Sequence, residues 1–179
     1  MAVWPIRKYG DPVLRKKAKP IVAFDANLQK LAAEMIETMQ AAKGIGLAAN
    51  QIGLTEALCV VDVGLIKEGE PPQVFINPVI LREDGKETSY EEGCLSIPEV
   101  TEEVLRKERI LVRYQGLTGV AQEQECDGML ARVLQHEIDH LNGILFIDRI
   151  SAVRRSLLKK KLKALADQTR QEMTASKVV

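Results

Sequence analysis

Apolar residues recur at helical spacing in three segments of the chain. The first covers about residues 25–42, where Asp25 can cap the start and Gly44 can end the helix. The same period predicts a second helix over about residues 128–141 and a third over about residues 151–166. The apolar side of the third helix comprises Val153, Leu157, Leu158, Leu162 and Leu165. Periodicity is lost after residue 166, so residues 167–179 are expected to form a frayed tail.

Three shorter segments have the composition of β-strands. Residues 57–63 are apolar and β-branched, residues 73–81 form a second strand interrupted near Pro78, and residues 110–114 form a third. No helical pattern lies between these segments, which favours antiparallel pairing over βαβ units. We therefore expect an α+β fold, in which short antiparallel β-sheets surround a central helix and a C-terminal helix follows. Residues 1–166 are expected to form one domain.

The charge balance and the cysteine content narrow the class of protein. Lys plus Arg and Asp plus Glu each number 25 in 179 residues, so no overall field attracts nucleic acid or an anionic membrane. No apolar run is long enough for a signal peptide or a bilayer span. Three cysteines are an odd, sparse set, which argues against a disulfide framework and favours a reducing cytoplasm.

The predicted helix over residues 128–141 contains the only two histidines of the chain. His136 and His140 flank Glu137 in an H-E-x-x-H pattern. Imidazoles at this spacing project from one face of a helix and can bind one cation, while the glutamate can act as the base for a water molecule. Met129 and Val133 share that face, so the histidines are expected to lie against apolar residues rather than in bulk water.

A catalytic site of this type usually has three protein ligands and an open position for water. No third histidine exists, and a metzincin peptidase would need one at position 146, which is Phe146. A thermolysin-like peptidase would need a glutamate on a following helix, and Glu172, in the poorly patterned tail, is the only one after His140. Cysteine is therefore the better candidate for the third ligand.

The three cysteines lie in different contexts. Cys94 follows a glycine that lets the backbone approach closely, whereas Cys59 lies within an apolar strand and is expected to be a core residue. Cys126 is the competitor of Cys94. If both bound the metal, the site would be a closed Cys₂His₂ structural zinc in a binding module, and Glu137 would have no water to act on.

Three segments together resemble the peptide deformylases. Residues 44–51 read GIGLAANQ, residues 92–96 read EGCLS and residues 135–140 read QHEIDH, in the order of that family's motifs and at similar separations. The similarity covers about residues 5–165, and the C-terminal helical segment is similar to the type 1 form found in bacteria and organelles. The resemblance implies an enzyme that removes the formyl group from the N-terminal formylmethionine of newly synthesised polypeptides and releases formate.

The resemblance also implies a role for individual residues. The metal ligands are Cys94, His136 and His140. Glu137 is the general base, and the Gln51 side-chain amide and the Leu95 backbone N–H donate hydrogen bonds to the oxyanion. The family's metal is usually ferrous iron, with zinc or nickel also able to occupy the site. A Cys–His₂ set suits several metals, so the sequence does not choose between them.

The substrate is expected to lie in extended form beside residues 44–46, because Gly44 and Gly46 permit close backbone approach. The same glycines can equally end a helix and form a turn. An apolar slot is needed for the methionine side chain. Candidates for its walls are Ile45, Tyr90, Leu95, Met129 and Val133. All five are also plausible core residues.

Two further expectations concern charged residues. Asp139 faces away from the histidine stripe and is expected to pair with a basic residue, for which Arg106 resembles the family's arginine at that place. The C-terminal helix has six basic and no acidic residues between Val153 and Lys163. The family's similar helix docks on the ribosome, whereas a solvated helix face is the alternative. The expected partners are thus formylmethionyl peptides and the ribosome, without a membrane. The sequence does not distinguish a bacterial cytoplasmic protein from a mature organellar one.

Overall fold

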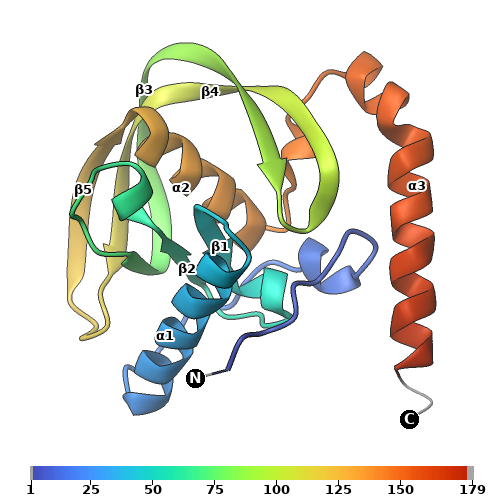
Figure 1. The fold of residues 1–179 in the computed structure, drawn as a ribbon. Helices are drawn as coiled ribbons and strands as arrows, with labels where there is room; N and C mark the ends of the chain where they lie inside the picture. Colours follow the sequence, from blue (N-terminus) through green and yellow to red (C-terminus); the bar gives the residue numbers. More distant parts are fainter. Residues whose placement is uncertain (1, 177–179) are drawn as a thin grey trace.

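A computed structural model describes residues 2–176 (Figure 1). Its centre is helix α2 (Gly128–Leu141), which packs against all five strands of one antiparallel sheet in the order β1-β2-β3-β4-β5. The strands are β1 (Gly46–Ala48), β2 (Leu58–Val61), β3 (Gln73–Cys94), β4 (Ile97–Gln115) and β5 (Ala121–Asp127). Within the described residues, 3₁₀ turns cover Pro12–Arg15, Ala49–Ile52, Val63–Leu65 and Phe146–Asp148. The predicted α+β class is confirmed, and the predicted bounds of the central helix agree with α2.

Strands β3 and β4 form a long hairpin that arches over α2 (Figure 1). The predicted strand over residues 73–81 is its first part. Pro78 does not end the strand, because the register shifts between Ile76 and Val79 and leaves Asn77 and Pro78 in a bulge, with Asn77 at φ 52°. The Asn77 side chain stabilises this bulge by hydrogen bonds with both backbone groups of Ile21 at 2.8 Å.

The outer part of the hairpin lacks an apolar pattern, so both strands are longer than the sequence predicted. Opposite charges face each other across it, as in Asp84 opposite Arg109 and Glu87 opposite Lys107. The strand expected over residues 110–114 is the end of β4. Strands β1 and β5 were not predicted, since β1 has only three residues and β5 is mostly polar and exposed.

Helix α1 (Ala26–Ala41) covers the other side of β1 and β2. Asp25 caps it as predicted, because its carboxylate accepts hydrogen bonds from the backbone N–H groups of Asn27 and Leu28 at 3.0 Å. Beyond the last turn, Lys43 rather than Gly44 takes the left-handed conformation, at φ 56°. The chain that leaves this helix therefore passes directly into the segment that leads to β1.

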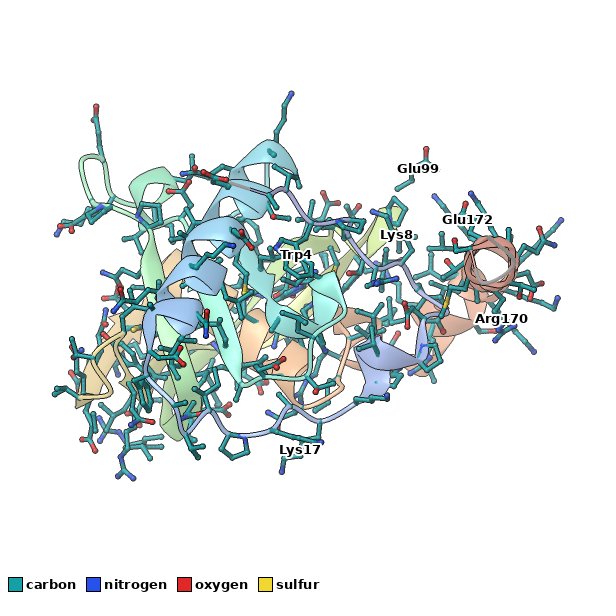
Figure 2. All side chains as sticks on the ribbon, turned by 90° about the horizontal axis from the view of Figure 1, so that it is seen from below. Trp4, Lys8, Lys17, Glu99, Arg170 and Glu172 are labelled. Atoms are coloured by element: carbon teal, nitrogen blue, oxygen red, sulfur yellow. The ribbon has the colours of Figure 1, made fainter. Side chains whose placement is uncertain are left out.

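Helix α3 (Ala152–Ala175) stands beside the rest of the molecule, and Figure 2 shows it end-on with side chains projecting over most of its circumference. Its inner stripe is Leu158, Leu162, Leu165, Ala166 and Thr169, whereas Val153 and Leu157 are 72% and 77% exposed. The prediction of a frayed tail from residue 167 onward is wrong as far as Ala175, where α3 ends. The buried stripe continues to Thr169, and because threonine is polar, the sequence shows no apolar period there. Residues 177–179 lie outside the described residues. Among those described, no helix is both long and apolar enough to cross a membrane.

Candidate metal centre

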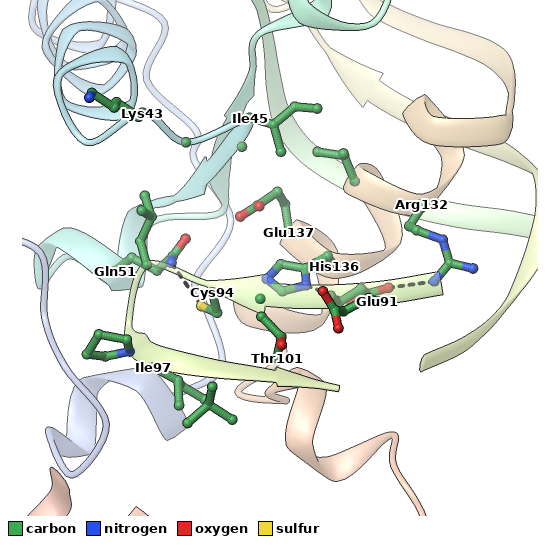
Figure 3. A pocket seen from close by; sticks show the side chains of 18 of the residues that line it. Lys43, Ile45, Gln51, Glu91, Cys94, Ile97, Thr101, Arg132, His136 and Glu137 are labelled. Atoms are coloured by element: carbon green, nitrogen blue, oxygen red, sulfur yellow. Dashed lines mark hydrogen bonds and ion pairs between the residues drawn. The ribbon is translucent and has the colours of Figure 1, made fainter. Parts of the chain in front are cut away.

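The β3–β4 hairpin and helix α2 bring three possible metal ligands together, of which Figure 3 shows Cys94 and His136. Cys94 ends β3 at the turn of the hairpin, and His136 and His140 lie one turn apart on α2. One ligand atom from each lies within 4.8 Å of the other two, and Cys94 Sγ is 3.2 Å from His140 Nε2. These are the three ligands that the sequence indicated.

The other two cysteines are not part of this cluster. Cys59 is fully buried on β2, as expected of a core residue, and burial raises the pKa of its thiol well above the usual value. Cys126 packs in the same apolar cluster, and burial together with Asp127 raises the pKa of its thiol to about 11. Within residues 2–176 the cluster of possible ligands contains Cys94 alone among the cysteines, which contradicts the closed Cys₂His₂ alternative.

The electrostatics of the cluster favour a positive charge. Burial alone would raise the pKa of the Cys94 thiol, but His140 and hydrogen bonds from both histidines lower it well below its usual range. Burial would lower the pKa of His136, but hydrogen bonds with Cys94 and Glu92 raise it to about 10. A thiolate and a carboxylate thus attract a cation to the space between the ligands, so the donor set fits a divalent metal ion.

Glu92 orients one of the two imidazoles. Its Oε2 lies 3.0 Å from His136 Nδ1, and since a carboxylate can only accept, this ring nitrogen donates and Nε2 remains available as a ligand atom. Glu92 is itself 7% exposed and accepts hydrogen bonds from Arg106 and Arg132. Burial would raise the pKa of Glu92, but His136 and Arg106 lower it to about 2, so the carboxylate stays charged.

Asp139 pairs with Arg106 as the sequence predicted, with Oδ2 2.8 Å from Arg106 Nη1. Arg149 also reaches Asp139, at 2.6 Å, from the solvent side. Arg106 therefore connects Asp139 on α2 with Glu92 on β3. Arg106 and Asp139 are both more than nine-tenths buried, so their ion pair is not a solvent-exposed salt bridge. Through Glu92 it forms part of the support of His136.

Glu137 lies beside the three ligands, and its carboxylate projects into the same space (Figure 3). It is 4% exposed, and its Oε2 is buried without a hydrogen-bond partner among the described residues. Burial raises the pKa of Glu137. A buried carboxylate with a free oxygen and a raised pKa is suited to accept a proton and to return it.

Gln51 is fixed with its amide N–H₂ toward the cluster. Its Oε1 accepts a hydrogen bond from the Ala48 backbone N–H at 2.9 Å, which sets the side-chain orientation. Its Nε2 lies 3.5 Å from Cys94 Sγ and 3.2 Å from Ser96 Oγ. Leu95 follows Cys94 in the hairpin turn, and its carbonyl accepts a hydrogen bond from Lys8 Nζ at 2.7 Å. Both predicted donors therefore lie next to Cys94.

An open cavity of about 530 Å³ leads to the cluster, and its lining is mainly apolar. The cavity contains every residue predicted for the substrate slot together with both glycines. These are Gly44, Ile45, Gly46, Tyr90, Leu95, Met129 and Val133. Tyr90 is 52% exposed at the rim, whereas Val133 is 5% exposed and also belongs to the core beneath.

The sequence interpretation assigned no role to Glu92, Arg132 or Lys8. Glu92 begins the segment EGCLS, so an acidic residue two positions before a ligand was an available signal. Arg132 belongs to a polar stripe of α2, but only the folded structure shows that this stripe is buried against β3 and β4. Lys8 is distant in sequence from all three motifs, and no signal pointed to it.

An α+β fold that brings a thiolate, two imidazoles and a buried carboxylate to the base of one cavity is typical of a hydrolase. The family model of polypeptide deformylase matches residues 3–156 of this chain. The chain belongs to the polypeptide deformylase family and is an enzyme of that family, which also excludes the peptidase alternative.

Relatives share most of their length with this chain. The peptide deformylase of Brucella suis biovar 1 (strain 1330) is 49% identical over 94% of this chain and 96% of its own length. The peptide deformylase of Thermotoga maritima is 51% identical over 92% of this chain and 97% of its own length. Among solved structures, a plant peptide deformylase (PDF1B) superposes with a TM-score of 0.90 at 34% identity, covering 96% of this chain and 94% of its own. The peptide deformylase of Thermus thermophilus superposes with a TM-score of 0.86 at 45% identity, covering 95% of this chain and 99% of its own.

Proposed function

We propose that this chain removes the formyl group from N-terminal formylmethionine of newly synthesised polypeptides, releases formate, and requires one divalent metal ion. The supporting observation is the set of Cys94, His136 and His140 ligand atoms within 4.8 Å of one another at the base of an apolar cavity. The relatives are named peptide deformylases, which supports the same reaction. We propose Fe²⁺ as the metal, with Zn²⁺ or Ni²⁺ as ions that purified protein can also carry.

When bound, the ion would supply Lewis-acid activation of the water and of the formyl group. Glu137 would accept the proton of the attacking water and return it to the leaving amine. Its buried Oε2, which has no protein partner among the described residues, supports this role. Glu92 and Arg106 would hold His136 in place during the reaction, because they already fix its Nδ1.

Gln51 would stabilise the negative charge that develops on the formyl oxygen. The bond from Ala48 to Gln51 Oε1 leaves the amide N–H₂ pointing at the site, so no reorganisation is needed when charge develops. The Leu95 backbone N–H would act as the second donor from the same turn as Cys94. Two donors of fixed direction on one oxygen are the usual arrangement for acyl transfer.

The substrate would bind as an extended strand beside the segment that enters β1. Among the strands of residues 2–176, β1 pairs only with β2, so its second edge is open, and this edge borders the cavity. A Cβ at Gly44 would meet Leu95 and one at Gly46 would meet Glu137, so both glycines leave room for side chains of the site. The methionine side chain would enter the apolar part of the cavity between Ile45, Met129 and Val133, with Tyr90 at the rim.

Formate release from formyl-Met-Ala-Ser tests the reaction directly. Protein purified without oxygen and loaded with Fe²⁺ should release formate, while acetyl-Met-Ala-Ser and unblocked Met-Ala-Ser should remain intact. Glu137→Ala should bind the same amount of metal and lose turnover by a factor of about 10² to 10⁴. Cleavage of the unblocked peptide, or full activity of Glu137→Ala, would contradict the proposal.

We further propose that α3 docks on the ribosome, where the substrate emerges. Its first part carries Arg154, Arg155, Lys159, Lys160, Lys161 and Lys163, all on exposed positions. Exposed Val153 and Leu157 add apolar surface to the same part of the helix. Phosphate contacts would make binding fall steeply with salt.

A pelleting assay with ribosomes tests this docking. Reversing the charge of residues 159 and 160 with K159E/K160E should reduce co-sedimentation at low salt and leave formate release from a tripeptide unchanged. A double reversal away from α3, K16E/K17E, lies on exposed positions and changes the net charge by the same amount, so it controls for net charge. Equal co-sedimentation of all three proteins would rule out docking through this helix.

We also propose that the protein acts in the cytoplasm. All three cysteines are free thiols, and Cys94 must remain reduced to bind a metal. Fractionation of cells of the source organism tests this proposal, and recovery of the protein with a membrane or secreted fraction would contradict it.

A further inference from the structure

Arg132 is the most heavily engaged arginine of the site, although it is neither a metal ligand nor part of the three motifs. It lies on α2 one turn before His136 and is 7% exposed. Its Nη1 donates to Glu92 Oε1 at 2.7 Å and to the Val104 carbonyl at 3.0 Å. Its Nη2 donates to the carbonyl and hydroxyl of Thr88 at 2.7 and 3.2 Å.

These contacts connect three elements at the level of Glu92. Thr88 and Glu92 belong to β3, Val104 belongs to β4, and Arg132 itself belongs to α2. The hydrogen bonds of the guanidinium therefore connect the turn of α2 that precedes His136 to both strands of the β3–β4 hairpin. Only a planar group with several N–H donors can satisfy these four acceptors at once, which a lysine cannot do.

Glu92 depends on both of its arginines. Its Oε1 accepts from Arg106 Nε and Arg132 Nη1, each at 2.7 Å, and its Oε2 accepts from Arg106 Nη2 and His136 Nδ1, each at 3.0 Å. Four donors saturate the carboxylate and leave it a single orientation. Without Arg132, Oε1 loses one of its two donors, and the hairpin loses the bond that ties Glu92 to α2 one turn before His136.

Arg132 also lines a second cavity. This cavity has a volume of about 660 Å³, and the other residues that line it lie near the start of α2 and on β3 and β4. Tyr90, Met129 and Arg132 line both cavities. The Arg132 guanidinium lies 5.5 Å from the centre of the Tyr90 ring, so this side chain also contacts a residue at the rim of the first cavity.

From this geometry we propose that Arg132 is a positioning residue, which holds His136 in its ligand orientation through Glu92. The inference rests on the proposed function, since it assumes that His136 binds the metal. In this role Arg132 acts through Glu92, and none of its hydrogen bonds goes to a ligand atom. Loss of such an outer partner commonly costs about 10- to 100-fold in metal affinity or activity.

Cobalt substitution provides a readout that does not depend on turnover. Loaded with Co²⁺, the wild type should show visible bands that report the ligand geometry. Arg132→Met, which keeps an unbranched apolar stem, should shift these bands and weaken Co²⁺ binding by about 10- to 100-fold. Arg132→Lys should shift them as well, since it keeps the charge but not the fork.

The matched control is Arg113→Met. Arg113 lies on β4 and also pairs with a carboxylate, but its hydrogen bond goes to Glu123 at 3.1 Å, and it is not among the residues that line the cavity. Its variant should keep the wild-type bands and affinity. Ethylguanidinium added to Arg132→Ala should restore the wild-type bands, whereas ethylammonium should not.

The outcomes separate the two hypotheses. If the Arg132 variants keep the wild-type Co²⁺ spectrum and affinity, or if Arg113→Met alters them equally, the positioning role is refuted. If the wild type binds Co²⁺ but releases no formate, the proposed function fails, and the spectra still decide the role of Arg132.

Discussion

Gly46 is the residue whose replacement should most directly disturb the proposed base. It is the first residue of β1, and a Cβ added there would lie 2.4 Å from Glu137 Oε1 and 2.9 Å from Glu137 Cγ and Cδ. Ordinary contact to a Cβ begins at 3.4 Å, so the Gly46→Ala methyl overlaps the carboxylate by about 1 Å. The glycine is thus needed for space, not for a left-handed backbone.

The carboxylate has little room to move away. Glu137 is 4% exposed, and its side chain lies near buried Cys59 as well as the metal ligands. The overlap must therefore move either the carboxylate or the backbone of β1 by about 1 Å. A displacement of that size in a reacting group costs about 10²-fold in rate, so we expect kcat of Gly46→Ala to fall about 100-fold.

The assay is formate release from formyl-Met-Ala-Ser together with the Co²⁺ spectrum. Cys94, His136 and His140 are not displaced by the new methyl, so metal content should remain at the wild-type value. Gly116→Ala is the matched control, because its Cβ meets only the end of the Gln122 side chain at 3.1 Å in a turn remote from the cavity. Wild-type kcat for Gly46→Ala would refute the placement of Glu137 as the base.

Three further variants test other parts of the structure. Cys126→Ser should bind one metal ion per chain with wild-type affinity, measured by metal analysis after dialysis; loss of metal would restore the closed-site alternative. Tyr90→Leu should raise KM for formyl-Met peptides several-fold and leave kcat nearly unchanged, because Tyr90 lies at the rim; a fall in kcat alone would argue against that place. Burial would raise the pKa of Asp148, but the Arg15 side chain lowers it below the usual value of 3.8. The ionised carboxylate therefore stabilises the fold above pH 3.8, and this contribution is lost as the pH falls through the pKa of Asp148 in the folded protein. Asp148→Asn should lower the unfolding free energy by about 0.5–1 kcal/mol at pH 7, after allowance for solvent screening, and by progressively less as the pH falls below 3.8; denaturant melts over a series of pH values test this, and a loss that does not change with pH would contradict it.

The ligands could be found in the sequence because their signals are local. His136 and His140 lie on one helix, and a helical period alone places them on a common face. Helices α1 and α2 have strong apolar stripes, and their predicted bounds agree with the structure to within one residue. Cys94 was selected by elimination and by resemblance rather than by any period.

The long hairpin could not be predicted in the same way. Residues 82–93 form a strand because they pair with residues 101–111, which lie 8 to 29 positions further along the chain, and neither face carries a continuous apolar pattern. The same limitation explains Glu92 and Arg132, whose partners lie on other elements. A residue that acts through tertiary contacts leaves no periodic trace, so Arg132 looked like one more polar position on α2.

The position of Cys94 itself depends on an irregularity rather than on regular pairing. The β3–β4 register jumps between Gly93, which pairs with Thr101, and Cys94, which pairs with Ile97. The extra residues of β4 form a bulge in which Glu99 has φ 59°, a conformation that a non-glycine residue adopts only when its surroundings hold it there. The Lys161 ammonium of α3 donates to the carbonyl of Glu99. A bulge redirects neighbouring side chains, so the thiolate faces α2 because this turn is irregular. The part of β4 that α3 contacts is therefore the part that positions Cys94, which explains how a helix so exposed can still contribute to the order of the site.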